Sequence, residues 1–344
     1  MENRTEISAL GEFGLIDQLT RNFEIRNAST IVSVGDDAAV IDHFGKQTVI
    51  TTDLLLEGVH FDLMYTPLKH LGYKSVVVNL SDICAMNAAP TQITVSIGVS
   101  NRFSVEALNE FYEGVYLACE KYNVDLVGGD TSASHKGFVI SVTAIGEVAP
   151  ERFVRRNTAN KGDLICVTGD LGAAFLGLTI LEREKKIYLE NPQVQPDLEQ
   201  EDYIVGRLLK PEARTDIIRF FAENDITPTA MMDLSDGLSS DILHICKQSN
   251  LGCRLYEDKF PIAEQTRKAA FKFGLDPTVC ALNGGEDYEL LFTLRQEDYD
   301  RITLNEEISV IGYMAELQEG SKIITKAGNT FDITAQGWNA FGEH

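Results

Sequence analysis

Strand-length apolar runs alternate with helical patterns along the whole of this 344-residue chain, and this alternation restricts the possible folds more than any other feature. In the first half, residues 47–53, 91–100 and 137–148 are rich in the β-branched residues typical of strands. Residues 68–88 contain few helix breakers, and residues 104–123 follow an amphipathic helical pattern. Because strands and helices are interleaved, we expect a mixed α/β or α+β fold rather than a sandwich or a bundle.

Two local features refine this expectation. Ser104 precedes the second helix and is expected to cap it, with Glu106 placing a negative charge in the first turn. A full capping box is absent, since the residue three positions after Ser104 is Ala107. The segment VDLVGGD, residues 124–130, is expected to form a short strand that ends in a glycine turn.

A polar and basic break, APERFVRRNTANKGD at residues 149–163, separates the two halves of the chain. Since a domain has roughly 150 residues, we expect an N-terminal domain over residues 1–149 and a C-terminal one over 150–344. In the second half we expect helices to about residue 183, a polar loop over about 184–202, helices to about 224 and a helix from Leu238. The expected strands are DLICVTGD, TAMMD, CRLYED and YELLFTL, with SVIGYM and SKIITK as the last two.

Composition excludes several classes of function. A formal net charge of -22 argues against a nucleic-acid partner, although it permits a small phosphorylated ligand that arrives with divalent cations. The six cysteines form no C-x-x-C pair, so free thiols in a reducing compartment are expected. The N-terminus MENRTEISAL does not resemble a signal peptide, and no apolar run approaches the ~18 residues of a membrane span. We therefore expect a cytoplasmic location.

Common catalytic motifs are absent. The chain has no P-loop, no protein-kinase motif set, no G-x-S-x-G and no H-E-x-x-H. Its six histidines are scattered, which disfavours a zinc site.

Carboxylates instead recur at the ends or inside of apolar segments. Each has a structural explanation when taken alone, since Asp236 could cap a helix and GGD is usually a turn. Together they would require positive compensation, because like charges in apolar surroundings are costly. Hard divalent cations accept such oxygen ligands, and Mg²⁺ shares its shell with phosphates. The residues concerned are Asp36, Asp37, Asp53, Asp82, Asp130, Asp233, Asp236, Glu286 and Asp287.

Seven segments, taken in order, resemble the thiamine-monophosphate kinase family. They are VGDDAAV, TTDLLLEGVHF, KSVVVNLSDICAMNAAP, LVGGDT, MMDLSDGLSSDI, NGGEDYELLF and the terminal GW-x-x-F. The resemblance as a whole runs from about Gly11 to Phe341. The family is more distantly similar to aminoimidazole-ribotide synthetase, selenophosphate synthetase and a hydrogenase-maturation protein. The resemblance implies two α/β domains, with the N-terminal sheets of two subunits forming a barrel-like homodimer core and ATP near the subunit interface. It also implies direct in-line transfer from ATP to thiamine monophosphate, assisted by several Mg²⁺ ions and giving thiamine diphosphate.

The resemblance also implies which residues form the site. The Mg²⁺ ligands would be Asp37, Thr51, Thr52, Asp53, Asp82, Asp130, Asp233 and Asp236. ATP would contact Gly129, Asp130, Arg156 and Ser235, with Tyr112 as a contact to the adenine or ribose. Thiamine monophosphate would contact His60, Glu286 and Trp338. The choice between Arg155 and Arg156 stays open, and no general base is assigned, since the attacking phosphate oxygen is already ionised.

Several other functions compete with this one. Selenophosphate synthetase requires a reactive cysteine near its N-terminus, and the first 80 residues contain none. The glycine-lysine signature of aminoimidazole-ribotide synthetase is also absent, although another ATP-dependent synthetase of the superfamily remains the alternative. A calcium-binding structural protein would contain D-x-D-x-D-G loops, which are missing. A metal-dependent phosphohydrolase would favour histidine ligands, and only His60 lies near a motif.

Overall fold

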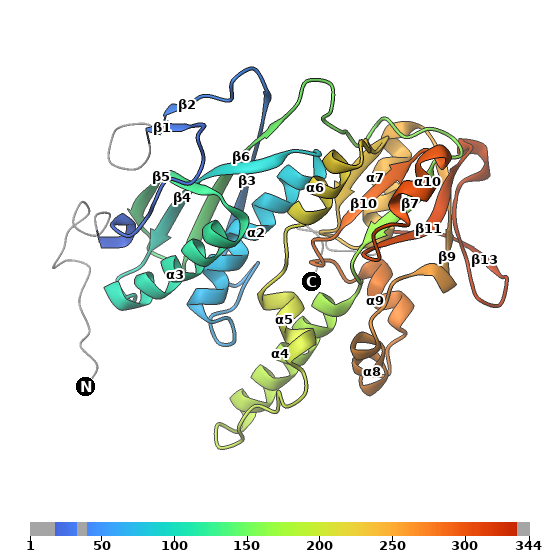
Figure 1. The fold of residues 1–344 in the computed structure, drawn as a ribbon. Coiled ribbons are helices and arrows are strands. Elements are labelled where there is room, and N and C mark those ends of the chain that lie inside the picture. Colours follow the sequence, from blue (N-terminus) through green and yellow to red (C-terminus); the bar gives the residue numbers. More distant parts are fainter. Residues whose placement is uncertain (1–17, 33–39, 336–344) are drawn as a thin grey trace. The chain divides into compact units, whose positions relative to one another are not determined.

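The computed structural model describes residues 18–32 and 40–335 of the chain. Two residues of the predicted site, Asp37 and Trp338, lie outside the described residues. The chain divides into two compact units: residues 1–83 with 88–151, and residues 84–87 with 152–344 (Figure 1). Each unit is described by itself below. The sequence-based boundary at residues 149–150 stays a prediction.

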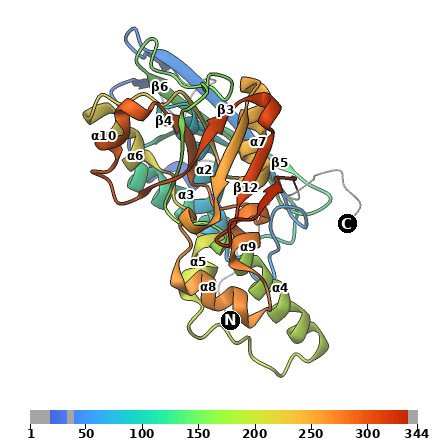
Figure 2. The ribbon, with the colours of Figure 1, turned by 90° about the vertical axis from the view of Figure 1, so that its right-hand side faces the viewer.

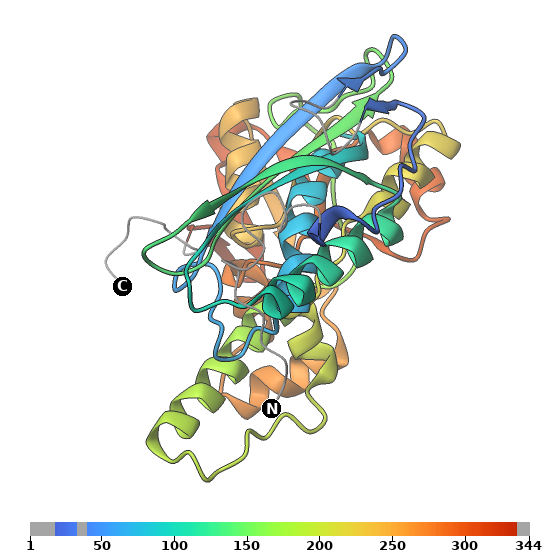
Figure 3. The same ribbon diagram turned by 90° about the vertical axis from the view of Figure 1, so that its left-hand side faces the viewer.

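The first unit contains a four-stranded sheet covered on one face by two helices (Figures 1 and 3). The strand order is β3-β6-β4-β5; only the β4–β5 pair is parallel. The strands are β3 (Gln47–Leu56), β4 (Ala89–Val99), β5 (Asp125–Ala133) and β6 (Val139–Val148), and the helices are α2 (Leu68–Ala85) and α3 (Val105–Tyr122). Two short strands, β1 (Thr30–Val32) and β2 (Val40–Ile41), pair separately.

One face of this sheet is apolar and buried, and the other is open. Along β6, buried and partly exposed residues alternate strictly, as expected for a strand that packs on helices with one side only. On β3 the open face carries Ile50 and Leu54, which are 65% and 53% exposed. The predicted capping of α3 is confirmed, because the Ser104 hydroxyl accepts a hydrogen bond from the Ala107 amide at 3.3 Å.

The second unit is built on a seven-stranded sheet with the order β13-β12-β9-β11-β7-β10-β8 (Figure 2). Within it only β9 and β12 pair in parallel. The strands are β7 (Leu164–Thr168), β8 (Ala230–Asp233), β9 (Gly252–Tyr256), β10 (Leu290–Leu294), β11 (Ile308–Ala315), β12 (Ser321–Ile324) and β13 (Thr330–Asp332).

Helices cover both faces of this sheet. On one face, α7 packs through Leu238, Ile242 and Ile245 against strand residues such as Met232 and Leu291. On the other face, α6 and α10 form a second apolar cluster with the alternate strand residues. A third cluster joins α4, α5, α8 and α9. The helices are α4 (Ala173–Glu190), α5 (Asp202–Leu209), α6 (Thr215–Glu223), α7 (Leu238–Ser249), α8 (Glu264–Lys272), α9 (Pro277–Asn283) and α10 (Tyr299–Ile302).

The expected mixed α/β class is therefore confirmed, while several element bounds were wrong. The first helix ends at Ala85 rather than at residue 88, and α4 continues to Glu190 through part of the expected polar loop. A further strand, β13, follows the two that were expected to be last. Gly128 and Gly129 lie inside β5, not in a turn. β5 pairs in parallel with β4 at this point. Glycine is required at position 129, because a side chain there would lie 1.9 Å from the carbonyl oxygen of Val95 on β4.

A buried ion cluster joins separate segments of the second unit. Glu289 is 2% exposed and accepts hydrogen bonds from Arg207 and Arg214, both at 2.9 Å. The Thr168 hydroxyl donates a third hydrogen bond to Glu289 at 2.6 Å and accepts one from the Leu290 amide at 2.8 Å. Since both carboxylate oxygens of Glu289 take part in these hydrogen bonds, removal of Glu289 deprives two buried arginines of the acceptor they share.

Replacing Glu289 with alanine should therefore destabilise the second unit strongly. The expected loss is about 3–5 kcal/mol, because two buried arginines lose their shared acceptor. Urea unfolding followed by circular dichroism measures it. Glu264→Ala is the matched control, since Glu264 pairs with Lys268 at the surface, where solvent screens the pair and its loss should have little effect. A loss at Glu289 no larger than the control would contradict the cluster's role.

Candidate active site

Three predicted metal ligands of the first unit meet between β3 and α2. Thr51 donates a hydrogen bond from its hydroxyl to Asp82 Oδ2 at 2.7 Å. Asp53 lies two residues further along β3, on the same face of the strand as Thr51. Its backbone amide donates to Asn79 Oδ1 at 3.0 Å, and the Asn79 amide group is fixed in turn by the Ser75 carbonyl. Helix α2 therefore holds β3 through Asn79 and places the Asp82 carboxylate beside that strand.

The electrostatics of this cluster favour a cation. Burial, and then the charge of Asp82, raise the pKa of Asp53 to about 6. Both causes disfavour the ionised form of Asp53. A bound cation would offset the repulsion between Asp53 and Asp82. The donor set consists of two carboxylates and a hydroxyl, which are ligands of hard cations such as Mg²⁺.

The structure does not bring the other predicted ligands of this unit to the same place. Thr52 is on the opposite face of β3, where its hydroxyl donates to the Val142 carbonyl and accepts from Thr143. Asp130 is exposed on β5, the other edge strand of the sheet, in the row of Ser96. Three strand spacings separate β3 from β5, about 14 Å, so one ion cannot contact both Asp53 and Asp130.

His60 is fixed in one tautomer by the loop that follows β3. Its Nδ1 accepts a hydrogen bond from the Leu56 amide at 3.0 Å, and its own amide donates to the Leu56 carbonyl at 2.9 Å. Because Nδ1 accepts, the neutral ring carries its proton on Nε2. The ring is exposed, and an Nε2–H group is a donor suited to a phosphate oxygen.

Tyr112 is not placed where a nucleotide could reach it within this unit. It is 6% exposed on the buried side of α3, where its ring meets the rings of Phe111 and Tyr116. Burial raises the pKa of its hydroxyl. Its predicted role as an adenine contact stays a prediction that this packing does not favour.

In the second unit, two predicted motifs are joined by their backbones. The Glu286 amide donates to the Ser235 carbonyl at 2.8 Å, and the Tyr288 amide donates to the Leu234 carbonyl at 2.9 Å. Glu286 has a φ of 59°, a left-handed conformation that non-glycine residues rarely adopt. Gly285 permits this approach, because a Cβ there would lie 2.6 Å from the Ser235 oxygen. Ser235 and Glu286 are thus fixed beside each other.

Asp236 does not cap the helix that follows it. The N-cap of α7 is Gly237, and no side chain caps that end. Burial raises the pKa of Asp236, while the positive charges of His244 and Arg156 oppose this shift. Arg156 is therefore near enough to Asp236 for its charge to act on that carboxyl group, whereas the Arg155 guanidinium lies 6.0 Å from the centre of the Phe153 ring. This arrangement favours Arg156 over Arg155 as the site residue.

Asp287, the neighbour of Glu286, has a structural role that the sequence did not reveal. Its carboxylate accepts hydrogen bonds from the Gly172 amide at 2.8 Å and the Ala174 amide at 3.5 Å, at the start of α4. It therefore caps a helix that is remote in sequence. Burial raises its pKa to about 7, against the lowering effect of Arg207.

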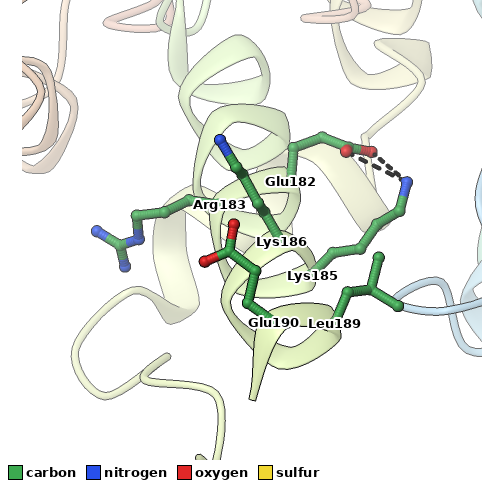
Figure 4. Close-up of a pocket in the computed structure, with 6 residues that line it drawn as sticks. All are labelled: Glu182, Arg183, Lys185, Lys186, Leu189 and Glu190. Atoms are coloured by element: carbon green, nitrogen blue, oxygen red, sulfur yellow. Dashed lines mark hydrogen bonds and ion pairs between the residues drawn. The ribbon is translucent and has the colours of Figure 1, made fainter. Parts of the chain in front are cut away.

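No preformed metal cage or membrane helix is present in the described part of the chain. Within residues 18–32 and 40–335, no group of three or more histidine, cysteine or carboxylate side chains could hold a metal ion by itself. None of the helices described there is long and apolar enough to cross a membrane. A pocket on the second half of α4 is lined by residues of that one helix, including Arg183, Lys186 and Leu189, and contains no predicted site residue (Figure 4).

Comparisons with known proteins agree with the motifs. Residues 35–148 match the family model of the AIR synthase related protein, N-terminal domain, and residues 160–323 match that of the C-terminal domain. The thiamine-monophosphate kinase of Aquifex aeolicus is 34% identical over 97% of this chain and 99% of its own length. That of Bacillus subtilis is 33% identical over 96% of this chain and 100% of its own length.

Solved structures give the same result. The complex of AaThiL with AMPPCP and TMP has a TM-score of 0.74 at 33% identity, covering 97% of this chain and 98% of that one. Thiamine-monophosphate kinase from Stenotrophomonas maltophilia has a TM-score of 0.78 at 30% identity, covering 94% and 98%. The hydrogenase maturation protein HypE, at 18% identity and a TM-score of 0.73 over 92% and 93% of the two chains, shares the fold. This chain belongs to the thiamine-monophosphate kinase family.

Proposed function

We propose that this protein phosphorylates thiamine monophosphate to thiamine diphosphate with ATP, by direct in-line transfer assisted by Mg²⁺. This is the last step in making thiamine diphosphate. Support comes from relatives named thiamine-monophosphate kinase over nearly the whole chain, and from the related complex with AMPPCP and TMP.

The contact between Thr51, Asp53 and Asp82 carries the proposal. Asp82 is close enough to raise the pKa of Asp53. The atoms of this group that could bind a metal are all oxygens. This chemistry fits Mg²⁺, which binds a few protein oxygens and completes its shell with water and phosphate. When bound, Mg²⁺ supplies charge neutralisation between the two phosphate groups.

The remaining residues bind and orient the two substrates. We assign Asp37, Thr52, Asp130, Asp233 and Asp236 to further Mg²⁺ contacts, and Gly129, Ser235 and Arg156 to ATP. His60, Glu286 and Trp338 are assigned to thiamine monophosphate. His60 donates from Nε2, since its Nδ1 already accepts from Leu56. Arg156 offsets the carboxylate of Asp236 and is available to phosphate oxygens.

The chemistry requires alignment more than proton transfer. Both partners are phosphates, so the attacking oxygen of thiamine monophosphate is already ionised and needs no strong general base. The chain's contribution is to place the acceptor oxygen in line with the bond from the γ-phosphorus to its leaving oxygen. The backbone interlock between Ser235 and Glu286 suits this task, because it fixes a nucleotide contact and an acceptor contact on adjoining loops.

We also propose that the protein acts as a cytoplasmic homodimer. The open face of the first unit's sheet carries Ile50 and Leu54, and a second copy covering this face would bury both. The separation of Asp53 from Asp130 within one copy is in keeping with a site near the interface of two copies. All six cysteines are buried and free, as expected in a reducing compartment.

The proposed activity predicts ADP release that depends on both thiamine monophosphate and Mg²⁺. A coupled ADP assay should show turnover with thiamine monophosphate and none above background with EDTA. Free thiamine should be a poor acceptor, since its hydroxyl would require a base that this site does not offer. Equal turnover with thiamine would refute the assignment.

Asp53→Asn should separate function from folding. The change keeps size but removes a charge, so turnover should decrease ~10²-fold or more, equivalent to about 2.7 kcal/mol of lost transition-state stabilisation. The melting temperature of the metal-free protein should be maintained, because Asp53 and Asp82 repel each other there. Asp42→Asn, at an exposed turn where Asp42 accepts from the Phe44 amide, is the control and should retain activity. Full activity with a lower melting temperature would make Asp53 a structural residue.

A further inference from the structure

Asp241 is a completely buried carboxylate that has been given no role so far. It lies in the first turn of α7 and is 0% exposed. Its Oδ2 accepts a hydrogen bond from the Gly237 amide at 3.2 Å. Its Oδ1 is buried and has no hydrogen-bond partner among the described residues. A buried carboxylate oxygen without a donor is unfavourable, so this arrangement calls for a ligand.

The groups that Asp241 faces make its position more unfavourable. Burial is the largest cause that raises its pKa to about 8, followed by the negative charges of Asp233 and Asp236. Only the backbone amides of Asp236 and Gly237 oppose this shift. Asp233 and Asp236, which share the nine residues DLSDGLSSD, 233–241, with Asp241, are thus close enough for their charge to act on it, and Asp233 is itself only 3% exposed.

Helix capping explains the hydrogen bond at Asp241 Oδ2 but not the position of Oδ1. An aspartate in the first turn of a helix often satisfies an amide, as Asp241 Oδ2 does for Gly237. Capping leaves the buried and unpartnered Oδ1 unexplained. Direct coordination of one ion by all three is not the answer either, because the described residues contain no such group of three.

We propose that Asp241 is a positioning residue for the cation held by Asp233 and Asp236, with Oδ1 accepting a hydrogen bond from a water on that cation. This inference rests on the proposed function, in which Asp233 and Asp236 bind Mg²⁺. Mg²⁺ retains several of its waters in protein sites. Outer partners of this kind change metal affinity by ~10–100-fold, although they never touch the metal.

Asp241→Asn tests the proposal on the full-length protein. Asparagine has the same shape, and its oxygen can still accept the hydrogen bond of the Gly237 amide. Its second polar group is then an NH2, which donates and cannot accept a hydrogen bond from a water. We expect Mn²⁺ affinity, measured by calorimetric titration in the presence of AMPPCP, to weaken by ~10-fold or more. The melting temperature of the metal-free protein should be unchanged or higher, because a neutral amide replaces a buried carboxyl group whose ionised form is disfavoured.

Asp276→Asn is the matched control. Asp276 also lies at the start of a helix in the second unit, where it accepts from the Thr278 amide at 2.8 Å and caps α9. Its replacement should leave Mn²⁺ affinity unchanged. Asp241→Ser, which keeps an acceptor in a smaller side chain, repeats the test if the asparagine variant does not fold, and should show the same weakening.

Two results would overturn the proposal. A lower melting temperature with unchanged Mn²⁺ affinity in both Asp241 variants would make Asp241 a helix cap only. Unchanged affinity with an unchanged melting temperature would also refute it. Asp233→Asn distinguishes this failure from failure of the proposed function: if that variant also binds Mn²⁺ normally, Asp233 holds no cation and the proposed metal site itself is wrong. If it weakens binding while the Asp241 variants do not, only the role of Asp241 fails.

Discussion

Negative charge in partly or fully buried positions is the constraint on which the rest of this structure depends. In the first unit burial and the charge of Asp82 disfavour the ionised form of Asp53, and in the second burial and the charges of Asp233 and Asp236 disfavour that of Asp241. Glu289, by contrast, is paired with Arg207 and Arg214. This contrast supports the proposal that Asp53 and Asp236 bind a cation, whereas Glu289 stabilises the fold of the second unit.

Two glycines allow close packing of the main chain in the predicted site motifs. Gly129 and Gly285 each occupy a position where any side chain would collide with a neighbouring carbonyl. Glycine is thus required at these two positions by close packing of main chain on main chain, whether or not a ligand is bound. Gly129 and Gly285, which in the sequence suggest a close approach of the backbone to phosphate, also allow neighbouring strands and loops to pack together.

The sequence predicted the strands and helices well, because their periodicity reports which side of each element is buried. It failed where the answer depends on a distant partner. Gly128 and Gly129 looked like a turn because their pairing with β4 is invisible locally. Asp236 looked like a cap, although Gly237 takes that position and Asp241 satisfies its amide. In the motif NGGEDYELLF, Asp287 was counted among the carboxylates that require a cation, yet it caps α4. Glu289 of the same motif binds two arginines, a role that the sequence did not reveal.

The interlock of residues 234–235 with 286–288 has a consequence for how the protein folds. Its hydrogen bonds join positions about fifty residues apart, and closing so long a loop is entropically costly before the intervening strands and helices are in place. We therefore expect the contact between residues 234–235 and 286–288 to form late in folding, after α7, β9 and α9. Hydrogen exchange at the amides of Glu286 and Tyr288, which donate in this contact, would report on its formation.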